Sequence, residues 1–413
     1  MTKIQTVDEL PLKPTENSIY AIESNGITAH THGFFKYPCK FIPHVPRWAI
    51  NKYCSGKACK IIDPFCGSGT TLVESILLGH EAYGVEIDSF GRMLAKVKTN
   101  KIDNHFEKRI ILFLKKLDDI KSQEEKIIPD INNISLWFTP SAIDILGKIK
   151  YLINKQKKDK HVYDFLSVCF ANIIRKASNA DEQSPKPYVS KRFPKIQNDD
   201  LSNKLKQIII KYLSKIKLSS VEFKNISQII GNDATNFKYE NKFDLAITSP
   251  PYINAFDYVR TLRLENLWLE LDNESTLREV KKKHVGTESL PINEEIAHPK
   301  SFPKELSEII KKIEIKDKKR ALVVTKYFSA MSENMSTVFN HLKKGGHYVI
   351  VIGDSNIKGV PVDTHSILLK IGKNLGYKKD ACFSYIIKNR YLRIPRQGRG
   401  GLIKNDWIIS LSK

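Results

Sequence analysis

The sequence predicts an α/β fold, in which helices cover both faces of a mainly parallel sheet and a mainly helical segment is inserted. Three observations support this prediction. A strand, a glycine-rich turn and a helix follow one another over residues 60–79. A second apolar strand, residues 243–247, runs directly into the motif Thr-Ser-Pro-Pro-Tyr. Between these two anchors, the apolar residues take the spacing of long, Lys-rich helices.

The first anchor has the composition of a site for a nucleotide-like ligand. Residues 60–63 complete a strand, and Gly67 and Gly69 allow the backbone to approach a ligand closely. Thr70 begins a helix that Gly79 ends. The turn lacks the Gly-Lys-Thr sequence of a phosphate-binding loop. Unpaired N–H groups at the start of this helix therefore favour a carboxylate over a triphosphate as the bound anion.

An acidic residue follows the next predicted strand. Residues 82–86 read AYGVE, so the strand ends on Glu86, which lies 19 residues after Gly67. In nucleotide-binding α/β folds, an acidic side chain about 20 residues after the glycine-rich turn binds the ribose hydroxyls. A glycine-rich turn alone is weak evidence, because ordinary strand–turn–helix units also contain glycine.

The second anchor, residues 248–258, combines groups that suit a reaction on an amine. Its two prolines lack an N–H, so the carbonyls of Ser249 and Pro250 can point out of the strand end as acceptors. Tyr252 supplies a flat face for stacking. Acceptors beside an aromatic ring suit the exocyclic amine of a nucleobase that has left its stack. Taken alone, the motif is equally consistent with a strand terminus that carries a buried tyrosine.

Together, DPFCGSGTT, GVE, GNDA and TSPPY resemble motifs of the S-adenosylmethionine-dependent DNA amino-methyltransferases, and serine before Pro-Pro-Tyr resembles the cytosine-N4 branch. The resemblance extends along residues 256–269. It implies a Rossmann-like methyltransferase sheet, S-adenosyl-L-methionine as cofactor, and double-stranded DNA with a flipped cytosine as substrate. The catalytic residues that it implies are Ser249, Pro250, Pro251 and Tyr252. The cofactor-binding residues that it implies are Tyr37, Asp63, Phe65, Gly67, Ser68, Gly69, Thr70, Glu86 and Asp233.

Residues 32–51 precede the glycine-rich turn and resemble the segment that closes the methionine pocket in this family. This position implies a circularly permuted motif order, with the cofactor-binding half before the catalytic half. Phe35, Tyr37 and Phe41 are candidates for the pocket wall, although each ring could instead cover the sheet edge.

Charge and segment composition indicate where DNA binds. The chain has 67 Lys and Arg against 45 Asp and Glu, a net charge of +22, which is typical of a polyanion-binding protein. We expect residues 1–100 to form an irregular N-terminal arm (residues 1–30) and the cofactor-binding half, residues 101–228 a helical insertion that contacts DNA, and residues 229–413 the catalytic half with a C-terminal hairpin. Candidate DNA contacts are Arg175, Lys176, Arg393, Arg396 and Arg399.

Several classes of protein are disfavoured. No apolar run reaches the ~18 residues of a membrane span and no secretory signal is recognisable, so we expect a cytoplasmic protein. The six cysteines lack metal-ligand spacing, so no metal site is expected. Pro38-Cys39 matches the nucleophile of carbon-5 cytosine methyltransferases, but there the dipeptide follows the glycine-rich turn, whereas here it precedes it.

The sequence therefore predicts a site-specific DNA methyltransferase acting on N4 of cytosine, the modification enzyme of a restriction–modification system with a separate cognate endonuclease. The alternatives are an N6-adenine DNA methyltransferase and an RNA base methyltransferase acting on guanine-N2, in which Asn or Asp usually precedes the prolines. An inactive DNA-binding subunit is a third alternative, against which the intact motifs at both anchors argue.

Overall fold

The computed structural model describes residues 4–23, 26–181, 184, 186–189, 198–253, 257–290, 296, 299, 301–388 and 404–413. The predicted DNA contacts Arg393, Arg396 and Arg399 lie outside the described residues and stay predictions. Within the described ranges, no helix is both long enough and apolar enough to cross a membrane.

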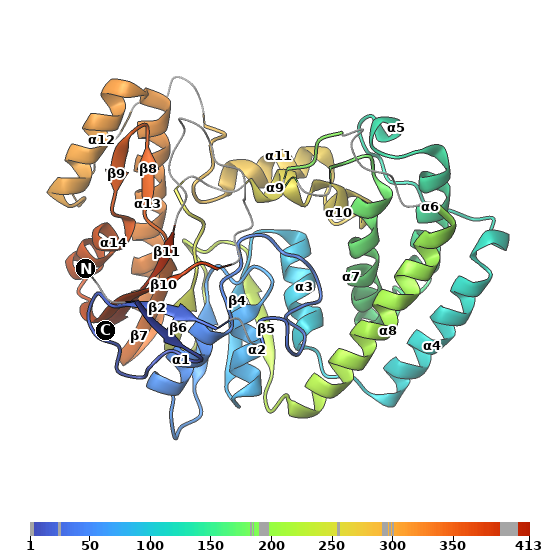
Figure 1. Cartoon of the computed structure of the whole chain (residues 1–413), viewed down its shortest axis with the longest axis horizontal. Coiled ribbons are helices and arrows are strands. Elements are labelled where there is room, and N and C mark those ends of the chain that lie inside the picture. Colours follow the sequence, from blue (N-terminus) through green and yellow to red (C-terminus); the bar gives the residue numbers. More distant parts are fainter. Residues whose placement is uncertain are drawn as a thin grey trace.

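A nine-stranded mixed sheet lies at the centre of the larger lobe (Figure 1). The strands are ordered β1-β2-β10-β11-β7-β6-β3-β4-β5. The five strands from β7 to β5 are parallel, and β11 is antiparallel to both β7 and β10. Their bounds are β1 (Ile4–Val7), β2 (Ile19–Ile22), β3 (Lys60–Asp63), β4 (Glu81–Val85), β5 (Ser227–Gly231), β6 (Phe243–Thr248), β7 (Leu342–Ile352), β10 (Lys378–Ile386) and β11 (Asn405–Ser412). A separate antiparallel pair consists of β8 (Ser355–Ile357) and β9 (Val360–Val362).

The chain order reverses between two neighbouring strands. From β3 the chain continues to β4 and β5 on one side, and it then returns to form β6 and β7 on the other side. In open α/β sheets, ligands bind outside the carboxyl ends of the strands at such a reversal. The residues that directly follow β3 and β6 are therefore placed where a site is expected, and these are the two anchors found in the sequence.

Helices cover both faces of the sheet, as predicted. Ile61 of β3 packs with Trp48 of α1 (His44–Tyr53), whereas Ile62 points to the opposite face and packs with Phe328 of α13 (Lys318–His341). On the α1 face lie α2 (Thr70–Leu77) and α3 (Ser89–Thr99), and on the α13 face lie α12 (Lys304–Lys316) and α14 (Thr364–Asn374). Because both faces are covered, the central strands are apolar along most of their length.

The segment between α3 and β5 is helical and forms the second lobe, on the right of Figure 1. It contains α4 (Asn104–Asp118), η1 (Ile120–Ser122), α5 (Ile134–Trp137), α6 (Pro140–Asn154), α7 (Lys160–Ala177) and α8 (Asn198–Glu222). Side chains of Asp103, Thr139 and Asp159 cap α4, α6 and α7. Phe90 of α3 and Phe165 of α7 belong to one apolar cluster, so the lobe is packed onto the sheet through α3.

Three further helices join the two lobes above the sheet (Figure 1). They are α9 (Tyr258–Thr261), α10 (Arg263–Trp268) and α11 (Glu274–Lys283). Trp268 is fully buried between Phe138 and Phe170 of the helical lobe, with ring centroids 5.5 and 6.1 Å away. The segment that follows the catalytic motif therefore ties that motif to the helical lobe.

The expectation that residues 1–30 form an irregular arm is wrong for two segments. β2 pairs in parallel with β10, with Ile19 opposite Ser384, and β1 pairs with β2. Each strand has only four residues, and three of the four in β1 are exposed, so the alternating apolar pattern of a strand is absent. The predicted C-terminal hairpin is confirmed by the antiparallel pair β10–β11.

Candidate active site

A pocket of about 820 Å³ brings the separate sequence motifs together at the carboxyl ends of the central strands. The glycine-rich turn, the residues after β4 and β5, and the strand end after β6 all contribute to its wall. The predicted site residues that line it are Tyr37, Phe65, Gly67, Ser68, Thr70, Glu86, Asp233, Ser249 and Pro251. Segments up to about two hundred residues apart in sequence thus face one cavity at the reversal point of the sheet.

The glycines of the turn are required by its geometry. Gly67 has φ +48°, and a Cβ there would lie 3.2 Å from Cε1 of Tyr37 on the opposite wall. Gly69 has φ +79°, and its Cβ would lie 3.0 Å from the Cβ of Ala95 on α3. Gly67 therefore faces the pocket, whereas Gly69 allows α2 and α3 to pack closely.

Asp63 lies behind the pocket wall and joins the two anchors. Its Oδ2 accepts from the Thr71 hydroxyl of α2 at 2.6 Å, and its Oδ1 accepts from the Thr248 hydroxyl of β6 at 2.6 Å. The Phe65 amide also donates to Oδ1, at 3.1 Å. Complete burial raises the pKa of Asp63 to about 6, although all three hydrogen bonds act in the opposite direction. These contacts hold the turn against β6, which leads into the Pro-Pro-Tyr motif.

Glu86 directly follows β4 and organises the floor of the pocket. Its carboxylate accepts from the Gly67 amide at 2.7 Å and from the Asp88 amide at 2.8 Å. Burial, followed by the nearby Asp88 charge, raises the pKa of Glu86 to about 7. Protonation of Glu86 near neutral pH removes acceptor capacity from the pocket.

Asp233 lies on the exposed rim of the pocket, after β5. Its Oδ1 accepts from the backbone amide of Thr235 at 2.8 Å and from the Thr235 hydroxyl at 2.7 Å. These two bonds leave the second carboxylate oxygen for another donor. Asp233 is thus an acceptor held in place at the rim of the pocket.

The residues of the Pro-Pro-Tyr strand end face in different directions. Ser249 and Pro251 face the pocket, whereas Pro250 is buried. The Tyr252 hydroxyl donates to Oδ1 of Asp406 at 2.5 Å and so points toward β11. Residues 254–256, which follow, lie outside the described residues.

The aromatic segment before α1 contributes Tyr37 and Phe41 to the pocket wall. Phe35, the third candidate, packs edge-on against Phe90 at 4.8 Å and does not line the pocket. Cys39 does line it as an exposed residue, and partial desolvation of its thiol by the pocket wall raises the pKa to about 12. A thiol that stays protonated at neutral pH is a poor nucleophile, which agrees with the sequence-based argument against covalent catalysis.

Tyr258 is a pocket residue that sequence reasoning missed. It lines the wall, and its ring stacks on the His284 imidazole, with centroids 5.9 Å apart and planes 7° apart. The Tyr37 ring lies 6.3 Å from it. The resemblance over residues 256–269 was the available signal, because it includes this tyrosine.

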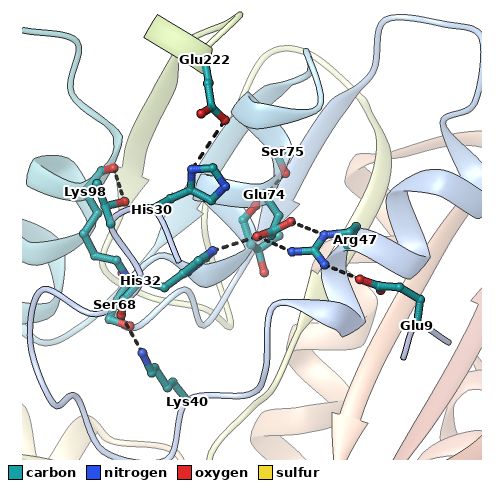
Figure 2. Close-up of polar contacts among 12 residues, drawn as sticks. Glu9, His30, His32, Lys40, Arg47, Ser68, Glu74, Ser75, Lys98 and Glu222 are labelled. Atoms are coloured by element: carbon teal, nitrogen blue, oxygen red, sulfur yellow. Dashed lines mark hydrogen bonds and ion pairs between the residues drawn. The ribbon is translucent and has the colours of Figure 1, made fainter. Parts of the chain in front are cut away.

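Figure 2 shows a polar network behind the pocket that sequence reasoning also missed. Lys98 of α3 donates to the Ser68 carbonyl at 2.8 Å, and the Thr31 hydroxyl donates to the Lys98 carbonyl at 2.8 Å. Lys98 is 1% exposed, and burial lowers its pKa. One buried lysine thus holds the glycine-rich turn and the aromatic segment, which form two walls of the pocket.

The same segment is also fixed to α2. His32 and Glu74 form a hydrogen bond of 2.8 Å, and the Arg47 guanidinium of α1 donates to Glu74 at 3.0 Å (Figure 2). Burial lowers the pKa of His32 to about 4, against the opposing effect of Glu74, so the imidazole is neutral at pH 7. The aromatic segment is therefore held at both of its ends.

The two predicted DNA contacts within the described residues lie near the end of α7. The Arg175 guanidinium donates to the carbonyls of Asp181 and Ser184 and so shapes the loop that follows this helix. Lys176 is partly exposed beside it. Contact of either residue with DNA stays a prediction.

The pocket wall fits a ligand that has a carboxylate, a diol and an amine. The Ser68 hydroxyl is buried in the wall and has no hydrogen-bond partner among the described residues, so it is available to a polar ligand. It lies beside the start of α2, where backbone N–H groups favour an anion. Glu86 and Asp233 supply acceptors along the pocket, and Tyr37, Phe65 and Phe41 supply apolar surface. S-adenosylmethionine has these groups.

Comparison with known proteins agrees with this site. The family model described as DNA methylase, for N6 and N4 methyltransferases, matches residues 13–96. The chain is 25% identical to the Type II methyltransferase M.MvaI of Kocuria varians, over 94% of this chain and 91% of that protein. It is 26% identical to the Type II methyltransferase M.MjaII of Methanocaldococcus jannaschii, over 55% of this chain and 44% of that protein.

Two solved structures align over most of the chain with low scores. TrmN from Thermus thermophilus has a TM-score of 0.32 at 8% identity and covers 90% of this chain and 49% of its own. A SAM-dependent methyltransferase from Methanosarcina mazei has a TM-score of 0.31 at 9% identity and covers 88% and 96%.

The family model and these relatives support a DNA methyltransferase of the N4/N6 type with S-adenosylmethionine as its cofactor. They agree with the predicted family and cofactor, and the predicted fold class is confirmed. The individual roles of the site residues stay predictions.

Proposed function

We propose that the protein methylates the exocyclic N4 amine of cytosine at a specific site in double-stranded DNA. This proposal rests on the position of Ser249, which lines the same pocket as Glu86 and Asp233. Serine before Pro-Pro-Tyr is typical of the cytosine-N4 branch in the family that the motifs resemble. The names of the relatives, Type II methyltransferases, support a role as the modification enzyme of a restriction–modification system, with a separate endonuclease.

Five pocket residues are suited to hold the cofactor, which supplies a methyl group bonded to positively charged sulfur. Ser68, with the N–H groups at the start of α2, suits the carboxylate. Glu86 accepts from the ribose hydroxyls, as the acid at this offset does in related folds. Asp233 accepts from the adenine amine, and Tyr37 and Phe65 enclose the apolar parts.

The strand end orients the amine that is methylated. A cytosine amine is a weak nucleophile because its lone pair is delocalised into the ring, and in a duplex its N–H groups are occupied. Once the base has been flipped out, the Ser249 hydroxyl and the Pro250 carbonyl accept hydrogen bonds from the two N–H groups of the amine, and Tyr252 stacks on the ring. Holding the amine in one direction accelerates transfer through positioning. The extra proton of the methylated amine is lost to solvent.

Identification of the modified nucleoside tests this proposal. DNA from cells that express the chain is digested to nucleosides and analysed by mass spectrometry, with a Ser249→Ala strain as control. The expected product is N4-methylcytosine, which is much reduced in the control strain. 5-Methylcytosine or N6-methyladenine as the sole product would contradict the assignment. Single-molecule sequencing of the same DNA gives the recognition sequence.

A further inference from the structure

Two tyrosine hydroxyls converge on one buried carboxylate beside the Pro-Pro-Tyr strand end. The Tyr252 hydroxyl donates to Oδ1 of Asp406 at 2.5 Å, and the Tyr385 hydroxyl donates to Oδ2 at 3.1 Å. Asp406 is 7% exposed, and in the described part of the chain no lysine, arginine or histidine forms an ion pair with it. Among the described residues, both carboxylate oxygens thus accept from neutral hydroxyl groups.

The three residues come from different parts of the sheet. Asp406 lies near the start of β11, and Tyr385 on β10 is its direct cross-strand partner. Tyr252 follows β6, and β7 lies between β6 and β11. The hydrogen bond from Tyr252 therefore reaches past β7 and connects the predicted catalytic strand end with the C-terminal hairpin.

A carboxylate is energetically unfavourable at this buried position. Burying a charged group costs free energy unless its hydrogen bonds are satisfied, and an apolar residue would pack the hairpin without that cost. The carboxylate gives the Tyr252 hydroxyl a strong, directional acceptor on the side away from the pocket. The hydrogen bond fixes where the Tyr252 ring axis points, and because a phenolic O–H lies in the plane of its ring, a directional acceptor also favours one ring plane.

We propose that Asp406 is a positioning residue for methyl transfer: oriented by Tyr385, it holds the Tyr252 ring in the plane on which the flipped base stacks. The inference rests on the proposed function, because it takes Tyr252 as the stacking residue. It makes the β10–β11 hairpin, which does not carry any of the family motifs, part of the apparatus for transfer.

The proposal implies a pH dependence with a defined sign. The titratable groups that face Asp406 are Tyr252 after β6, Tyr385 on β10 and Cys39 in the aromatic segment. Burial raises the pKa of Asp406 to about 6, although the two tyrosine hydrogen bonds act in the opposite direction. A protonated carboxyl group donates from one oxygen and cannot accept from both tyrosines there. The arrangement is therefore present above about pH 6 and is lost as the pH falls through that value.

Single-turnover transfer to a duplex that carries the recognition sequence tests the proposal. Asp406→Ala is expected to slow transfer by about 100-fold, because a misplaced ring loses alignment, while cofactor and DNA dissociation constants change by less than about threefold. Asp406→Asn, which forms hydrogen bonds but does not titrate, is expected to transfer at an intermediate rate that no longer falls below pH 6. Tyr377→Phe is the matched control, since it removes a buried hydroxyl that donates to the Met335 carbonyl at 2.9 Å.

A double-mutant cycle separates positioning from simple loss of packing. If Tyr252 and Asp406 act through their shared hydrogen bond, Tyr252→Phe and Asp406→Ala each slow transfer, and the double variant is barely slower than either. Wild-type transfer rates in Asp406→Ala, or rate losses that multiply in the double variant, overturn the proposal. Thermal unfolding shows whether each variant is folded, and if Asp406→Ala is not, the pH profiles of Asp406→Asn and Tyr385→Phe decide. A wild-type protein that methylates no DNA overturns the proposed function and this inference together, whereas active wild type with unaffected variants overturns only the inference.

Discussion

Thr248 and Asp63 join the catalytic strand to the glycine-rich turn through a buried hydrogen bond of 2.6 Å between the hydroxyl and Oδ1. Asp63 also accepts from Thr71 on α2 and from the Phe65 amide. The cofactor-binding and catalytic motifs thus share one acceptor, although 185 residues separate the two partners in the sequence. A disturbance on either side of this bond is transmitted to the other.

Replacement of Thr248 by Val tests that connection. The substitution keeps the shape of the side chain and removes a hydrogen bond to a charged group, so we expect a loss of about 1.5–3 kcal/mol in unfolding free energy and weaker cofactor binding. Thr325→Val is the control, because that buried hydroxyl bonds only to the Ala321 carbonyl within α13. Calorimetry that finds wild-type cofactor affinity in Thr248→Val would show that the turn keeps its shape without this bond.

Gly67→Ala is expected to weaken cofactor binding by at least about tenfold, because a Cβ at φ +48° is strained and lies 3.2 Å from the Tyr37 ring. Gly56→Ala is the matched control. Gly56 has φ +74°, so its backbone is strained similarly, but a Cβ there meets no atom within 4 Å. Equal losses of affinity in the two variants would mean that backbone strain, and not the pocket wall, causes the effect.

The affinity for S-adenosylmethionine is expected to fall as the pH decreases through about 7. The raised pKa of Glu86 means that its carboxylate, the proposed acceptor for the ribose hydroxyls, is progressively lost below this value. The contribution of Glu86 to folding stability depends on pH in the opposite direction. Because the folded-state pKa lies above the ordinary value of 4.5, the Glu86 contribution to stability is present at low pH and is lost as the pH rises through about 7.

Measuring the Glu86→Gln variant over the same pH range tests both predictions, the one for cofactor affinity and the one for folding stability. The variant should bind the cofactor more weakly with no pH dependence near 7, and the pH dependence of its melting temperature should be smaller than that of the wild type. Cofactor affinity in the wild type that stays constant between pH 8 and 6 would exclude Glu86 as the titrating acceptor.

Cys39→Ser is expected to leave the transfer rate within about twofold of the wild type, because a thiol with a pKa of about 12 is not the attacking group. Single-turnover kinetics measure this directly. A large loss of rate, together with a covalent complex on DNA that contains 5-fluorocytosine at the target position, would instead identify a carbon-5 mechanism.

DNA affinity is expected to fall steeply with salt, as the net charge of +22 suggests. Replacing Arg393, Arg396 and Arg399 by Ala should reduce the slope of log K against log salt by about 2.7 if each contacts one phosphate. Replacing Lys311, Lys312 and Lys319 by Ala removes the same charge from exposed positions of α12 and α13, outside the helical insertion, and serves as the control. If both triple variants lower the slope equally, the effect is one of net charge alone.

The parts of the site that the sequence predicted are those where one short segment carries its own physical signature. The central residues of β3 and β6 are apolar because both faces of the sheet are covered, and the glycines of the turn have positive φ angles that other residues avoid. Tyr258 was passed over because an aromatic residue in an amphipathic helix has the same pattern whether it lines a pocket or a core.

The interactions that the sequence could not predict join residues that no motif connects. Lys98 lies in a helix whose other lysine, Lys96, is exposed to solvent. Only the packing of α3 against the turn shows that Lys98 is buried and donates to the Ser68 carbonyl. Asp406 is one acid in a hairpin strand, and its two tyrosine partners become neighbours only when β10, β11 and β6 lie in one sheet. Such contacts depend on strand order, which single-sequence patterns do not encode.

The two ends of the helical lobe meet at one point of the sheet. The Ser227 hydroxyl at the start of β5 donates to the Thr99 hydroxyl at the end of α3, and nearby the Ile102 amide donates to Ser220 at 3.1 Å. The chain thus leaves the sheet after Thr99 and returns to it at Ser227, 128 residues later in the sequence, and a hydrogen bond joins these two points. Because its two ends are neighbours, a segment of this kind can differ in length between relatives while the order of the strands stays the same.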